Sequence, residues 1–136
     1  MTRGRPPKKA ATEALPCAER RGSVVELPGT SGIPYDLMIF SPLSIVFVKV
    51  KRMRARVQGP LDAESKYSSE IRALRVLPES PVAIKELWVL SSHAVWQYFR
   101  IFPDRVVEIR SDGTFVGGSG QDEGQQTGIT DSREGG

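Results

Sequence analysis

The feature that most constrains this fold is a pair of short apolar segments, residues 35–40 and 45–50, separated by the four residues SPLS. Both segments are rich in residues that favour strands, and the spacer suits a four-residue hairpin loop. With Phe40 opposite Ile45, every apolar residue of one strand faces an apolar residue of the other, and a shift of one residue would destroy this matching. The pattern therefore predicts an antiparallel hairpin with a defined register.

Side chains alternate along a strand, so this register sorts the hairpin into two faces. One face is wholly apolar, and the other is apolar near the loop and charged at the far end, where Asp36 lies opposite Lys49 and Lys51 follows. Strands that are apolar on both faces predict a sheet covered on both sides. The charges leave two interpretations open. In the first, Asp36 and Lys49 form a cross-strand ion pair and Lys51 extends to water. In the second, the three residues form a functional site.

The other segments predict a domain that mixes helices and strands. A helix over residues 62–76 is expected because Tyr67, Ile71 and Leu74 form an apolar stripe. A shorter helix is expected over residues 9–21, and further strands over residues 24–27, 82–90, 95–102 and 106–109. This order predicts an α/β or α+β fold in which helices flank a mixed sheet. Composition predicts one domain, residues 9–112, between two disordered tails, residues 1–8 and 113–136.

Charge is distributed unevenly along the 136 residues, although the formal net charge is only +3. Residues 49–56 hold five basic side chains and no acid, which favours a phosphate-bearing partner, with a merely solvated surface as the alternative. Cys17 is the only cysteine, which fits a reducing cytoplasm. No apolar run approaches the roughly 20 residues that span a bilayer, so no membrane association is expected.

The N-terminal residues Arg3-Gly4-Arg5-Pro6 are similar to the core of an AT-hook. In that motif, arginines lie in the narrow, negative minor groove of A·T-rich DNA. Arg3 and Arg5 are therefore candidate DNA contacts. The alternative is a basic tail that adds only non-specific phosphate affinity.

Residues 31–52, "SGIPYDLMIFSPLSIVFVKVKR", resemble the catalytic core of the PD-(D/E)XK nuclease superfamily, especially the archaeal-type Holliday junction resolvases. In that family an Asp begins one strand and the next strand carries Glu-x-Lys, often followed by a basic residue. Asp36 matches the Asp, Lys51 the Lys and Arg52 the basic residue. Ser31 matches a Ser-Gly stretch that precedes the Asp in those resolvases. The resemblance extends over about residues 9–90.

The resemblance implies a restriction-endonuclease-like core, DNA as partner, and a homodimer that acts on branched or damaged DNA in recombination or repair. It also implies Mg²⁺, held by carboxylates, which activates water and polarises the phosphate. Asp36 would bind the metal and Lys51 would stabilise the transition state. Lys49, Arg52, Arg54 and Arg56 would hold backbone phosphates.

Lys49 departs from the family pattern, because it occupies the position of the second carboxylate. Glu70, or Glu64 as second choice, could supply that acid from the helix over residues 62–76. Glu13, with Glu19 behind it, is the candidate from the first helix. Three hypotheses therefore stay open: a magnesium-dependent endonuclease, a catalytically inactive DNA-binding module of the same fold, and a small structural or partner-binding protein.

Overall fold

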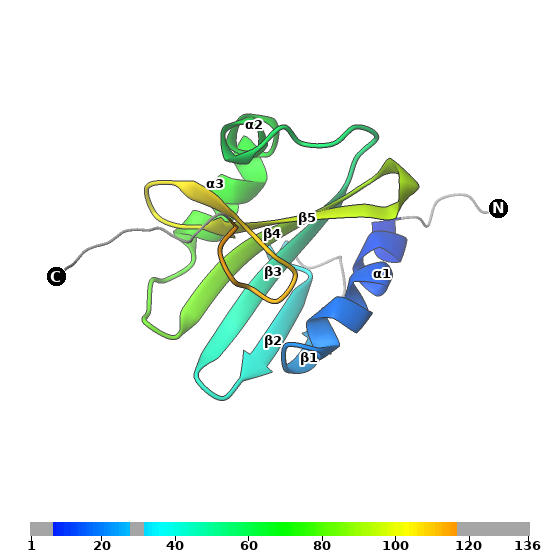
Figure 1. Ribbon diagram of the computed structural model, residues 1–136. Coiled ribbons are helices and arrows are strands. Elements are labelled where there is room, and N and C mark those ends of the chain that lie inside the picture. Colours follow the sequence, from blue (N-terminus) through cyan, green and yellow to red (C-terminus); the bar gives the residue numbers. More distant parts are fainter. Residues whose placement is uncertain (1–6, 28–31, 117–136) are drawn as a thin grey trace, which may run out of the picture.

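A six-stranded mixed sheet forms the centre of the protein, and helices flank it (Figure 1). The computed structural model describes residues 7–27 and 32–116. The strands lie side by side in chain order: β1 (Ser23–Glu26), β2 (Leu37–Ser41), β3 (Ser44–Arg52), β4 (Ala83–Ser91), β5 (Val95–Ile101) and β6 (Val106–Ile109). All neighbours are antiparallel except β3 and β4. This confirms the predicted mixed sheet flanked by helices.

The hairpin of β2 and β3 has the predicted register. Phe40 lies opposite Ile45 and Met38 lies opposite Phe47. The connecting turn is shorter than the expected four residues, because Ser41 and Ser44 also pair and their hydroxyls lie 2.8 Å apart. Only two residues therefore remain in the turn, and the two serine side chains close it.

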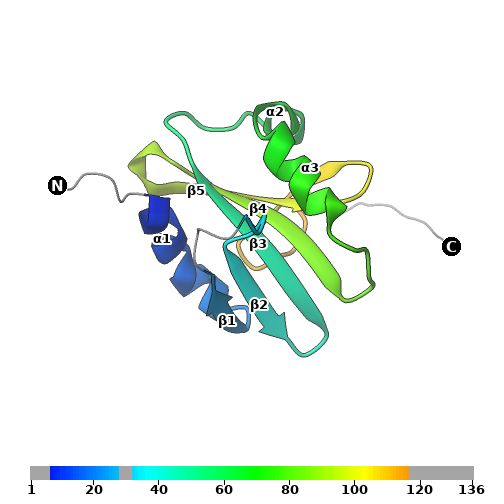
Figure 2. The ribbon, with the colours of Figure 1, turned by 180° about the vertical axis from the view of Figure 1, so that it is seen from behind.

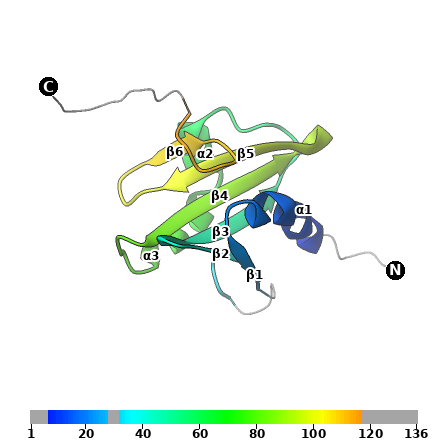
Figure 3. The same cartoon turned by 60° about the horizontal axis from the view of Figure 1, so that its bottom comes forward.

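Helix α1 (Pro7–Glu19) covers one face of the sheet (Figure 3). Ala10, Ala14 and Ala18 are buried at the helical spacing of four residues. Their small side chains lie in one cluster with the wholly apolar face of the hairpin and with Trp88. The members from β2 and β3 are Leu37, Ile39, Val46, Val48 and Val50.

The other face is covered by two short helices, α2 (Pro60–Lys66) and α3 (Ser68–Val76), where one helix over residues 62–76 was predicted. The backbone leaves the helical region at Tyr67, with φ −117° and ψ 35°. Ala63, Tyr67 and Leu74 nevertheless pack in the same core cluster, so the break keeps both helices in contact with the sheet. Figure 2 shows α2 and α3 on the side of the sheet away from α1.

The prediction that the hairpin is covered on both faces is wrong for the part beside the turn. The main contacts of helix α3 with the sheet are with β4 and β5, and part of the apolar surface near the hairpin turn stays open to solvent. Phe40 stays 37% exposed, and Val25 on the adjacent strand stays 44% exposed.

After β6, Phe115 forms an isolated bridge with Ile109. No helix in the described ranges is long and apolar enough to cross a membrane.

A buried acid, Glu86 of β4, joins the turn that follows α1 to the sheet. It is completely buried and accepts two hydrogen bonds from Arg21, at 2.8 and 2.9 Å, and one from Arg100 at 2.9 Å. The indole N–H of Trp88 donates a fourth, at 2.9 Å. Burial alone would raise the pKa of Glu86. The hydrogen bonds and positive charges of the two arginines outweigh burial and hold this pKa below its ordinary value.

We predict that Glu86→Gln lowers the free energy of unfolding by about 3 kcal/mol near pH 7, because it leaves two arginines without their buried anion. The pKa of Glu86 is lower in the folded than in the unfolded chain. Its stabilisation is therefore present above the ordinary pKa of 4.5 and is lost as the pH falls. Urea unfolding measured from pH 7 to pH 3 should show that the difference in free energy of unfolding between parent and variant shrinks as the pH falls. A difference that does not depend on pH would contradict a lowered pKa of Glu86. The control is Glu26→Gln, at an exposed position.

Candidate functional site

The far end of the hairpin brings a carboxylate and an ammonium group together. Asp36 precedes β2 and continues the pairing of this strand with β3, since its backbone N–H donates to the Val48 carbonyl at 2.7 Å. Its Oδ2 accepts a hydrogen bond from the backbone N–H of Val50 at 2.8 Å and lies 3.7 Å from Lys49 Nζ. The structure therefore contains the cross-strand ion pair that was one of the two interpretations.

A second ion pair lies next to the first on the same face. Lys51 is two residues beyond Lys49, about 6.6 Å along the strand, so both side chains point toward the α3 side. Lys51 Nζ lies 3.3 Å from Oε2 of Glu70, in the first turn of α3. We call Asp36, Lys49, Lys51 and Glu70 the β3 charge cluster. Two carboxylates and two ammonium groups give this cluster no net charge.

The other candidate carboxylates do not join the β3 charge cluster. Arg52 follows Lys51 and therefore lies on the α1 side of the sheet, where its Nη2 is 3.6 Å from Glu13 Oε1. Glu64 pairs with Arg75 at 3.0 Å. Glu19 is exposed at the end of α1. The sheet thus separates Glu13 from Glu70, and the two cannot ligate the same ion.

These residues do not fit a Mg²⁺ ion. Such an ion needs several oxygen ligands and excess negative charge, whereas Asp36 and Glu70 each face a lysine. Lys49 also places an ammonium group where a second carboxylate was expected. Across residues 7–27 and 32–116, no group of three or more Asp, Glu, His or Cys side chains is arranged to hold a metal.

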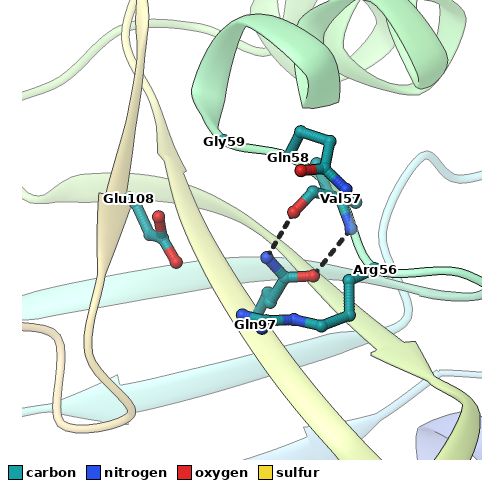
Figure 4. Close-up of a pocket in the computed structure, with 6 residues that line it drawn as sticks. All are labelled: Arg56, Val57, Gln58, Gly59, Gln97 and Glu108. Carbon is teal, nitrogen blue, oxygen red and sulfur yellow. Dashed lines mark hydrogen bonds between the residues drawn. The ribbon is translucent and has the colours of Figure 1, made fainter.

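The chain leaves β3 through an exposed basic segment. Arg52, Arg54 and Arg56, which we call the basic exit, follow one another at every second position, and all three are exposed. Their loop is fixed by Gln97 of β5, whose side chain accepts from the Val57 N–H at 2.9 Å and donates to the Val57 carbonyl at 2.8 Å (Figure 4). Gln97 is not predictable as a site residue from the sequence, because a single amide in a strand carries no pattern. Ser31, Arg3 and Arg5 lie outside the described residues.

Comparisons with known proteins give matches among solved structures only. No family model matches the sequence, and no curated protein matches it. A solved structure of Archaeoglobus fulgidus Hjc, a Holliday junction resolvase from an archaeal hyperthermophile, matches with 17% identity and a TM-score of 0.49 over 75% of this chain and 86% of that chain. Because this similarity is low, we base the function on the residues of the site.

We predict that Lys49→Glu creates affinity for Mn²⁺ that the parent chain lacks. The substitution removes the ammonium group beside Asp36 and adds a carboxylate on the same face of the sheet, which changes the charge there by two units. Calorimetric titration with Mn²⁺ should show binding to the variant only. Lys66→Glu, which makes the same charge change on α2, should show none. Equal titrations for parent and Lys49→Glu would contradict this geometry.

Proposed function

We propose that this protein binds the phosphate backbone of branched or damaged DNA, as a nuclease-like module that does not cleave it. The basic exit would contact the phosphates, and the β3 charge cluster would lie beside them. The observation that supports this proposal most is the pairing of both cluster carboxylates with lysines. A role in recombination or repair follows from the resemblance of residues 31–52 to resolvases.

The ion pairs explain how a DNA backbone could approach this surface without a metal. A cluster with unpaired carboxylates would repel phosphate until a cation neutralised it. Here Lys49 and Lys51 supply that neutralisation from the chain itself. Both pairs are partly exposed to water, so each stabilises the fold by only about 0–1 kcal/mol, and the lysines can reorient toward a phosphate.

Arg54 and Arg56 supply the attraction. Both are exposed, and neither forms an ion pair with another residue of the described chain. A guanidinium that has no internal acid keeps its donors for a ligand, and phosphate suits its forked geometry. Metal-dependent cleavage is the second candidate, and the match of Asp36 and Lys51 to the nuclease motif favours it. It would need Asp36 to exchange its lysine for a metal.

We predict that the protein binds a four-way DNA junction in EDTA without cleaving it, and that adding Mg²⁺ produces no cleavage. Fluorescence anisotropy at several salt concentrations should give a steep loss of affinity with salt. Arg54→Gln should reduce the slope of log affinity against log salt by about 0.9, the value for one lost phosphate contact.

Arg105→Gln is the matched control, because Arg105 is also exposed but lies in the turn between β5 and β6. It should leave the slope unchanged. A slope near zero for the parent would remove the phosphate-binding role. Cleavage in Mg²⁺ that disappears in Asp36→Ala would instead establish the enzyme.

A further inference from the structure

A small polar pocket opens beside the basic exit, between its loop and strands β5 and β6 (Figure 4). Its volume is about 210 Å³. Pockets for drug-sized ligands measure about 300–1,000 Å³, so this one suits a single ring system. Its lining residues are Arg56, Val57, Gln58, Gly59, Gln97 and Glu108.

The wall of this pocket is fixed by a buried amide. Gln97 is only 4% exposed, and both its oxygen and its nitrogen are bonded to the backbone of Val57. Gln97 therefore holds the loop in place and has little capacity left for a ligand. A fixed wall lowers the entropy that a ligand would lose by ordering the loop.

Two groups of opposite charge remain to contact a ligand. Arg56 extends from the loop and Glu108 from β6, and Gln97 lies between these two segments (Figure 4). Within the described chain, Arg56 and Glu108 form no ion pair with each other or with any other residue. The pocket thus offers a forked donor on one side and a carboxylate acceptor on the other.

Guanine satisfies both groups best among the nucleobases. Its O6 and N7 accept two hydrogen bonds from an arginine. Its N1–H and N2–H₂ are two adjacent donors, which match the two oxygens of a carboxylate. Cytosine, adenine and thymine each lack that pair of adjacent donors, so they would leave part of the Glu108 carboxylate without a partner.

We propose that this pocket binds an unpaired guanine of a DNA strand whose backbone lies on the basic exit. The guanine must be unpaired because N1–H and N2–H₂ are bonded to cytosine in a duplex. The base pocket and the phosphate contacts adjoin one another, since Arg56 belongs to both. This inference rests on the proposed function and adds to it a preference for exposed guanine.

The test compares labelled single strands bound to the full chain by fluorescence anisotropy. The strands are a thymidine 12-mer and the same strand with one central guanine or one central inosine. We expect the guanine strand to bind about fivefold tighter than the thymidine strand or more. Inosine lacks the N2 amino group and should lose most of this preference.

Glu108→Gln should abolish the guanine preference, and its affinity for the thymidine strand should stay the same or rise, because it loses a negative charge. Glu26→Gln loses the same charge at the opposite edge of the sheet and should keep the preference. Equal, salt-dependent binding of all three strands would overturn the guanine pocket and leave the phosphate role standing. Binding of none of them would also overturn the guanine pocket, and binding of the four-way junction would then decide separately whether the phosphate role stands.

Discussion

The contacts of the Asp36 carboxylate determine whether this site carries a free negative charge. The carboxylate accepts a hydrogen bond from the Val50 N–H and faces the ammonium group of Lys49. The first contact fixes Asp36 to the neighbouring strand, and the second neutralises its charge. Oδ2 makes both contacts, so this carboxylate links the two strands of the hairpin and already faces a cation from the chain itself.

The two faces of the sheet then determine which charged side chains can pair. Alternation along β3 sends Lys49 and Lys51 to the α3 side and Arg52 to the α1 side, so each basic residue pairs with an acid from a different element. Beyond Arg52 the chain has no acid until Asp62, and Arg54 and Arg56 remain available to a ligand. The chain thus changes from a neutralised cluster at the end of β3 to a cationic surface in the loop that follows, within five residues of Lys51.

The sequence was sufficient to predict the hairpin, because its apolar matching permits only one register. The pairing of Asp36 with Lys49 followed from that register. The partner of Lys51 and the separation of Glu13 from Glu70 depended on where the helices pack, which local patterns do not specify. Glu86 and Gln97 were missed for a related reason. Each is a polar residue inside a strand, and its partners are distant in sequence. The break at Tyr67 also escaped, since the apolar spacing continues across it.

We propose that lysines, and not a metal, neutralise the acids of this site. The most direct test is an NMR titration of the ¹⁵N-labelled protein with Mn²⁺, because this paramagnetic ion broadens the amide signals of nearby residues. The amides of Lys49, Val50 and Lys51 should broaden no more than those of the control strand β6. Selective loss of these three signals at low Mn²⁺ would show a metal beside Asp36 and would contradict the claim.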